Sequence, residues 1–289
     1  MPNLRDIKRR IKSVKNTQQI TKAMKLVSAS KLRKAQEAII SARPYALKLM
    51  EVLHHLSARC NHDIHPLLDD RDGNRWLILS ITADRGLCGS FNGSIIRKTL
   101  QVIEENSEKQ IQLITAGKKG HAIFRNRDNK ILQDHSGWTR DFDYLKAASI
   151  GSTLASLFSE KSVDRVFILY NEFKSVMQQE VILEQLLPVV PEKLDTGRGN
   201  MKVVDYIYEP EEEAILGNLL ERYMTVEVYR AFLESSASEH GARMTAMDSA
   251  SRNAGEMIGG LTLTYNKARQ AYITKELIEI VNGAEALKA

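Results

Sequence analysis

The chain has 289 residues, 43% of them hydrophobic and 27% charged, which suits a soluble protein of one or two domains. No run reaches the ~20 apolar residues of a membrane helix, and the N-terminus lacks the apolar core of a signal peptide. The formal net charge is +5 and the basic excess lies at the start of the chain, so we expect an acidic partner surface.

The first 43 residues predict one long amphipathic helix. Neither glycine nor proline occurs between Asn3, which can cap the helix, and Arg43. Between Met1 and Lys34 there are eleven Lys or Arg residues and a single acidic residue. Such a basic start is also found in transit peptides, but the apolar stripe favours a helix that is retained in the mature protein. The phase of the stripe slips near Gln18. The stripe comprises Leu4, Ile7, Ile11, Val14, Ile20, Met24, Val27, Leu32, Ala35 and Ile39.

The middle of the chain alternates strands and helices, which predicts a mostly parallel sheet covered on both faces. The run 76–82 is almost continuously apolar, as expected for a strand buried on both sides. The run 176–190 alternates enough for an edge strand. The other predicted strands are 110–115, 131–135, 164–170 and 203–208, and the predicted helices are 90–106, 118–127 and 142–161.

Few residues of this middle region suggest chemistry. The turn 84–93 follows a strand, as a phosphate-binding turn does, but its glycines do not match G-x-G-x-x-G, and 116–120 is not a Walker loop. We therefore favour a structural tight turn over nucleotide binding. Cys88 is interpreted as packed in that turn in preference to a nucleophile.

Metal and nucleic-acid binding are also disfavoured by the residue pattern. Cys60 and Cys88 match no spacing for zinc or iron–sulfur ligands and are interpreted as reduced thiols. The histidines at 54, 55, 62 and 65 have no carboxylates or cysteines at a spacing that matches a metal site, so we interpret them as solvated loop residues. The basic first helix could follow phosphates, but it lacks aromatic residues that stack on bases. We expect no cofactor and no metal.

The C-terminal region predicts a second long helix from about Leu216 to Ala289, about 110 Å long at 1.5 Å per residue. Its apolar stripe follows a heptad repeat from Leu216 to Tyr272, which is typical of a helix that supercoils on a partner. Only Arg230, His240 and Ser251 interrupt the stripe. We expect it to pair antiparallel with the first helix and to extend about 30 to 40 residues beyond it.

The predicted fold class is therefore α/β, with a long antiparallel coiled coil of N- and C-terminal helices and an inserted Rossmann-like domain. We assign residues 1–58 to the N-terminal coiled-coil helix, 75–208 to the α/β domain and 211–289 to the C-terminal helix. The residues alone leave three functions open: a coiled-coil element that acts on a protein partner, an enzyme that uses Asp84, Arg85 and Cys88, and a nucleic-acid-binding tether.

Four long segments closely resemble the γ subunit of F-type ATP synthases, and the likeness extends over the whole chain. They are 16–33 on the basic helix, the turn 84–89 (Asp-Arg-Gly-Leu-Cys-Gly), 239–247 and 265–280. The resemblance implies a non-catalytic rotor shaft that turns inside a ring of α and β subunits and stands on the ε subunit and the membrane c-ring. It implies neither nucleic-acid binding nor a membrane span of its own.

The resemblance also implies contact residues. Met24 and Arg243 match shaft residues near an acidic loop of the catalytic β subunit, and Arg269, Gln270 and Thr274 match polar contacts with a catalytic-subunit loop. Tyr206, Tyr208 and Glu209 match the foot that meets the ε subunit and the rotor ring. Photosynthetic relatives carry a cysteine pair that is missing between Val190 and Val204, so redox switching of that kind is not expected. A bacterial chain at the cytoplasmic side of the inner membrane is favoured.

Overall fold

The computed structural model describes residues 4–57, 65–127, 130–140, 142–189 and 212–286. The chain divides into two compact parts, one formed by residues 29–243 and the other by residues up to Ser28 together with those from Met244 onward. We call the first the α/β part and the second the coiled-coil part. The predicted strand 203–208 and the cap at Asn3 lie outside the described residues.

The α/β part contains a five-stranded sheet in the order β3-β2-β1-β4-β5. β1 (Arg75–Ile81), β2 (Gln110–Ala116), β3 (Ile131–His135) and β4 (Arg165–Phe173) are parallel, whereas β5 (Gln179–Leu187) pairs antiparallel with β4 at the edge. Five of the predicted strands are therefore confirmed, as is the mostly parallel sheet. Apolar runs made the central strands β1 and β4 predictable, because both faces of the sheet are covered there, whereas β5 was predicted from its alternating pattern.

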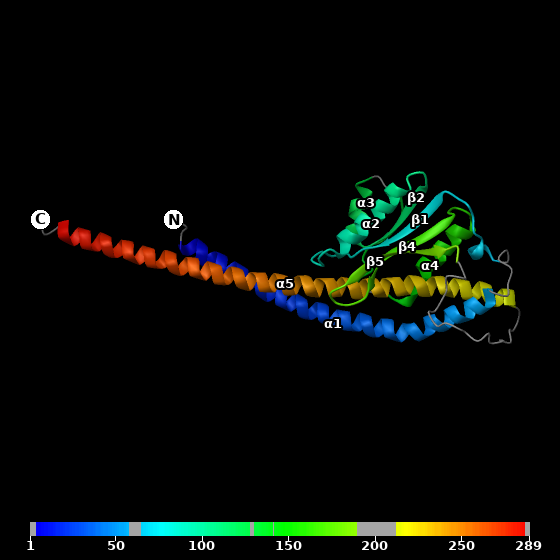
Figure 1. The fold of residues 1–289 in the computed structure, drawn as a ribbon, viewed down its shortest axis with the longest axis horizontal. Coiled ribbons are helices and arrows are strands. Elements are labelled where there is room, and N and C mark those ends of the chain that lie inside the picture. Colours follow the sequence, from blue (N-terminus) through cyan, green and yellow to red (C-terminus); the bar gives the residue numbers. More distant parts are fainter. Residues whose placement is uncertain (1–3, 58–64, 128–129, 141, 190–211, 287–289) are drawn as a thin grey trace. The chain divides into compact units, whose positions relative to one another are not determined.

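Helices cover both faces of the sheet (Figure 1). α2 (Phe91–Glu105) and α3 (Lys118–Arg125) pack on one face through Ile95, Val102 and Phe124. α4 (Tyr144–Ser159), capped by Asp143, packs on the other face through apolar residues spaced at helical intervals. A short 3-10 helix, η2 (Pro66–Leu68), contributes Leu67 and Leu68 to the same core.

Two long helices complete the fold: α1 (Leu4–Ser57) and α5 (Glu212–Ala286). α1 continues through Pro44, so the first helix is longer than the absence of proline up to Arg43 suggested. Within the α/β part, Leu49 and Leu53 of α1 share a core with Leu216 and Leu220 of α5. α5 is buried almost all round here, because the sheet and α4 cover the faces that α1 leaves open.

In the coiled-coil part, α1 and α5 run antiparallel, as predicted. The amide Nε2 of Gln18 donates to the carbonyl of Ser251 at 3.2 Å, and Nζ of Lys25 lies 2.6 Å from Oδ1 of Asp248. Residue numbers rise along one helix as they fall along the other. Opposite charges flank the seam, meaning the line of contact between the helices, at the pair of Lys25 and Asp248.

The predicted stripe on α1 was wrong at Ile20 and Val27, whereas Leu32 and Ala35 of the same stripe are buried as predicted. Ile20 and Val27 are 59% and 57% exposed, whereas Thr21 and Ser28 are buried. The physical reason is the phase slip: after Gln18 the face toward α5 continues through small polar residues that allow close approach. Ile20 and Val27 therefore point to solvent.

The length of helix that stands alone was overestimated. Ala254 is buried, Ile258, Leu261, Tyr265 and Ala268 are half-buried, and every described side chain from Arg269 to Ala284 is exposed. The heptad position Tyr272 is thus not part of a seam. The uncovered stretch is shorter than the predicted 30 to 40 residues, because α1 continues past Arg43 to Ser57 and can therefore cover more of α5.

Candidate functional site

The N-terminal half of α1 presents a basic surface that also carries aliphatic side chains. Lys8, Arg10, Lys12, Lys15 and Lys22 are exposed, and so are Ile20, Leu26 and Val27. Met24 is half-buried and lies one helical turn from both Ile20 and Val27, at the border between the seam and this surface. Exposed aliphatic residues beside cations suit a partner surface that is acidic and partly apolar.

Arg243 lies on α5, is the last residue of the α/β part, and is only 8% exposed. One of its Nη atoms lies 2.7 Å from Oε1 of Glu239 and donates to the carbonyl of Gly86 at 3.3 Å. The other lies 3.3 Å from Nδ1 of His240. Its guanidinium is therefore engaged within the chain, where it holds the turn 84–89 against α5.

Burial sets the charge of the groups around Arg243. It lowers the pKa of His240 to about 4, helped by the positive charges of Arg243 and Lys31, so the imidazole is neutral and its Nδ1 can accept from Arg243. Burial also raises the pKa of Glu239, whose Oε2 has no hydrogen-bond partner among the described residues. The ion pair with Arg243 opposes that rise.

The turn 84–89 is a structural element, as the sequence indicated. Burial alone would raise the pKa of Asp84, but hydrogen bonds from Thr139, Gly137 and Lys118 bring it below its ordinary value. Cys88 is 2% exposed, and burial raises the pKa of its thiol. Arg85 and Leu87 point to solvent instead.

This geometry argues against the enzyme interpretation of the turn. Asp84 is saturated by donors, Cys88 is buried as a thiol, and Arg85 faces away from both. The three side chains do not converge on a space where a substrate could react, which a nucleophile and its acid–base partner require.

The residues predicted to contact a catalytic-subunit loop lie on the exposed end of α5. Arg269, Gln270 and Thr274 are all exposed. Gln270 and Thr274 share one helix face, where the hydroxyl of Thr274 donates to the carbonyl of Gln270 at 3.0 Å. Arg269 precedes Gln270 and points about 100° away around the helix. These side chains are accessible to a partner that surrounds the helix.

Other predicted residues lie partly or wholly outside the described part of the chain. Tyr206, Tyr208 and Glu209 belong to this group, as do Cys60 and the side chains of three of the four clustered histidines. The fourth, His65, caps η2 by accepting from the backbone N–H of Leu67 at 3.3 Å. Within the described residues, no group of three His, Cys, Asp or Glu side chains could hold a metal ion.

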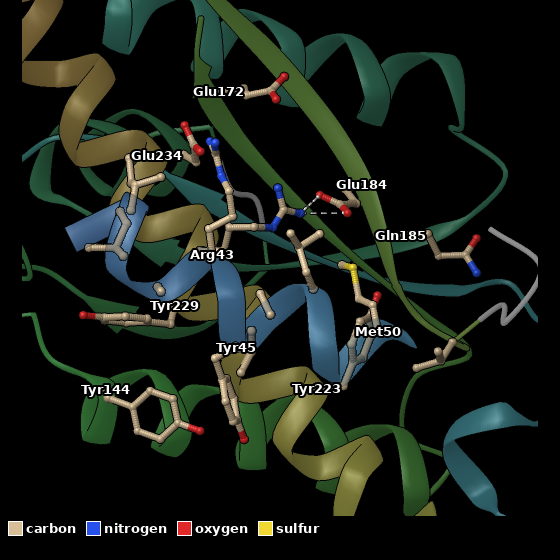
Figure 2. Close-up of a pocket in the computed structure, with 18 of the residues that line it drawn as sticks. Arg43, Tyr45, Met50, Tyr144, Glu172, Glu184, Gln185, Tyr223, Tyr229 and Glu234 are labelled. Atoms are coloured by element: carbon tan, nitrogen blue, oxygen red, sulfur yellow. Dashed lines mark hydrogen bonds and ion pairs between the residues drawn. The ribbon is translucent and has the colours of Figure 1, made fainter. Parts of the chain in front are cut away.

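A cavity of about 940 Å³ opens between α1, α5 and β5. In Figure 2 its tyrosines lie toward one end and its carboxylates toward the other: Tyr45, Tyr144, Tyr223 and Tyr229, and Glu172, Glu184 and Glu234. Arg230 lines this cavity and pairs with Glu184 at 2.8 Å. Sequence reasoning missed this ion pair, although Arg230 interrupts the heptad stripe and that interruption was the available signal.

None of the helices in the described residues is both long and apolar enough to cross a membrane. α1 and α5 exceed the length of a membrane span but carry charges throughout.

Comparison with known proteins decides among the interpretations. The model of the ATP synthase family matches residues 3–287. A chain from Geobacter sp. (strain M21) named ATP synthase gamma chain is 49% identical over the full length of both chains. This chain belongs to the ATP synthase gamma chain family. A gamma chain from Anaeromyxobacter sp. (strain Fw109-5) is 50% identical, again over the full length of both chains.

Solved structures agree with this gamma chain assignment. The central stalk and c-ring structure of the Tetrahymena thermophila mitochondrial ATP synthase contains a chain that is 29% identical, with a TM-score of 0.60 over 80% of this chain and 99% of that one. A chain of the Euglena gracilis mitochondrial ATP synthase superposes with a TM-score of 0.73 over 98% of this chain and 94% of that one. At 22% identity, the second match concerns the fold alone.

Proposed function

We propose that this gamma chain is the central rotor shaft of a bacterial F-type ATP synthase. In this role it couples proton flow through the membrane c-ring to ATP synthesis or hydrolysis in the hexamer of α and β subunits, and it also contacts the ε subunit. The named relatives are bacterial gamma chains, and the Tetrahymena thermophila match comes from a central stalk with its c-ring.

The observation that carries this proposal is the change of environment along α5. The helix runs unbroken from Glu212 to Ala286, about 110 Å at 1.5 Å per residue. It is packed on nearly all sides in the α/β part and exposed on all sides from Arg269 to Ala284. A helix gripped at one end and bare at the other can carry torque into a surrounding bearing.

The exposed end suits a surrounding partner. Its large apolar side chains spread over more than half of the helix circumference, at about 100° per residue. They are Tyr272, Ile273, Leu277, Ile278, Ile280 and Val281. Apolar residues exposed in this number are typical of a partner surface. We therefore place this end inside the catalytic hexamer, with Arg269, Gln270 and Thr274 as its polar contacts.

The basic surface of α1 supports a second set of contacts. We propose that Met24, beside exposed cations and aliphatics, meets the acidic loop of a β subunit. Arg243 takes part by holding the turn 84–89 in place, since its own guanidinium is buried. Tyr206, Tyr208 and Glu209 remain the proposed foot on the ε subunit and c-ring.

We also propose the finer assignments that the family alone leaves open. The three-domain division at 1–58, 75–208 and 211–289 treats the helices as one functional shaft. The chain is non-catalytic in this proposal, because Asp84 and Cys88 of the candidate turn are already used in folding. It resides peripherally on the cytoplasmic side of the bacterial inner membrane, held there by the c-ring.

The proposal is tested by deleting the gene for this chain in its bacterial host and then returning it. Without the chain, inner-membrane vesicles should lose ATP-driven proton pumping, and the returned chain should restore it and co-purify with α, β, ε and c subunits. Retained pumping without the chain would contradict the rotor role. Nucleotide turnover by the isolated chain that survives repeated purification would contradict its non-catalytic assignment.

A further inference from the structure

One face of α5 is polar although it is turned toward the core. Arg230, Glu234 and Ser238 recur every four residues and therefore lie one above another along the helix. Each forms a hydrogen bond with the pair β4–β5. Burial raises the pKa of Glu234, and Arg43 of α1 is close enough for its positive charge to oppose that rise. We call these three residues the latch face. The sequence showed only that Arg230 interrupts an apolar stripe.

Arg230 forms the most connected member of the latch face. Its Nη2 lies 2.8 Å from Oε2 of Glu184 on β5, and its Nη1 donates to the hydroxyl of Tyr170 on β4 at 3.0 Å. Nη2 also lies 2.6 Å from Oε2 of Glu227, which is 1% exposed on the same helix. The dashed lines at Glu184 in Figure 2 mark the pairing with Arg230.

The next two turns of α5 contact β4 directly. A carboxylate oxygen of Glu234 accepts from the backbone N–H of Phe173 at 3.0 Å, and the buried hydroxyl of Ser238 donates to the carbonyl of Asn171 at 3.1 Å. One turn further, a Cβ on Gly241 would lie 3.2 Å from the ring of Phe173 and 3.7 Å from the Cα of Val176. The helix thus lies directly against the β4–β5 hairpin along three turns.

Apolar packing and hydrogen bonds contribute differently to this contact. Apolar burial holds α5 against the sheet but is non-directional, so it resists rotation or sliding of the helix only weakly. Hydrogen bonds and bidentate ion pairs require defined distances and angles. A partly buried ion network adds little net stability, and its best-attested use is to fix register.

We propose that the latch face fixes the rotational and axial position of α5 against the β4–β5 hairpin, so that α5 and the sheet turn as one body. Arg230, Glu234 and Ser238 are then positioning residues for torque transmission. The inference rests on the proposed rotor function and adds the contact by which torque passes between the sheet and α5.

The first test loosens the latch without removing its half-buried cation, Arg230. The double variant Glu234→Ala, Ser238→Ala loses two hydrogen bonds, which should raise the unlatched population roughly 10- to 100-fold. The matched control is Glu221→Ala, Ser236→Ala, which makes the same chemical changes on α5 away from the latch face. In assembled ATP synthase at equal subunit content, protons pumped per ATP hydrolysed should fall in the latch variant only. Equal ratios in the two variants would overturn the proposal.

The second test replaces the latch with a covalent bond. Gly241→Cys and Val176→Cys place two thiols within reach of a disulfide, in a chain that also carries Cys60→Ser. With the latch face intact, pumping per ATP should be the same in the oxidised and reduced states. A loss on oxidation that reduction reverses would overturn the proposal, because it would show that helix and hairpin move past each other.

The two tests combine into a rescue that simple misfolding cannot imitate. Adding the cysteine pair to Glu234→Ala, Ser238→Ala should restore coupling when oxidised and lose it when reduced. If the double variant fails to assemble, the cross-linked native chain decides the matter. Failure of the proposed rotor function would give a different result, because ATP-driven proton pumping would then persist when the whole chain is removed.

Discussion

The two ends of α5 use one helix for opposite purposes. Between Leu216 and Arg243 almost every side chain is buried or half-buried, in a core shared with α1, α4 and the sheet. Between Arg269 and Ala284 every described side chain is exposed. The gripped end packs its large apolar groups and ion pairs within the chain, whereas the bare end exposes its side chains to the partner that we propose surrounds it. Torque requires the first environment, and low-friction rotation requires the second.

The largest expected effect comes from comparing two C-terminal truncations, one that removes the polar contacts and one that removes only the tip. Removing residues 265–289 deletes Arg269, Gln270 and Thr274 together with half-buried Tyr265, so ATP-driven pumping should be almost abolished. Removing only 283–289 leaves them in place and begins at Gly283, which weakens the helix, so pumping should fall slightly. Both are measured in membranes with matched levels of assembled complex. Equal, complete loss in both would mean that the tip grips its partner.

The next contrast compares one apolar residue from each end. Phe232 is fully buried, and its ring stacks on that of Phe142 with centroids 4.0 Å apart. Phe232→Ala should lower the free energy of unfolding by about 3–5 kcal/mol. Leu277→Ala, at an exposed site, should change it by about 0.5 kcal/mol or less. Urea unfolding followed by tryptophan fluorescence measures both, and similar losses would contradict the assigned burial.

A smaller effect depends on pH. Because the pKa of His240 falls to about 4 on folding, the unfolded chain binds the extra proton between about pH 6.5 and 4. Stability should therefore fall as the pH drops through this window. When the pH falls from 7.5 to 5, the free energy of unfolding of the native chain should decrease by about 2 kcal/mol more than that of the variant His240→Gln. The amide oxygen of Gln in this variant can still accept from Arg243. Parallel urea titrations at the two pH values measure the difference, and identical losses would refute it.

The smallest contrast uses two helical glycines. A Cβ on Gly259 meets no atom within 4 Å, so Gly259→Ala should slow local amide exchange about fivefold, as about 1 kcal/mol of helix propensity implies. In Gly241→Ala the new methyl group lies 3.2 Å from the Phe173 ring, which should offset that gain. Hydrogen exchange around each position measures this difference. Equal protection in the two variants would show that the β4–β5 hairpin moves aside for the new methyl group at little cost.

The sequence predicted the sheet well and the helix contacts less well, for a physical reason. Buried strands are continuous apolar runs, so β1 and β4 were visible locally. The seam depends on which partner faces each turn, and no local pattern showed that Thr21 and Ser28 would be buried while Ile20 and Val27 would not. The partner of Arg230 lies 46 residues away in sequence, on an edge strand. The sequence showed that Arg230 interrupts the heptad repeat, but only the folded structure shows the ion pair that explains the interruption.

Rotation of the α/β part against the catalytic hexamer tests the central claim most directly. Met177 is 82% exposed in the β4–β5 turn, so Met177→Cys, combined with Cys60→Ser, offers a site for a visible probe. With the hexamer of the purified complex fixed to a surface, the account predicts that added ATP drives continuous rotation of the probe in one direction. A probe that stays fixed while the same complex hydrolyses ATP and remains fully assembled would contradict it.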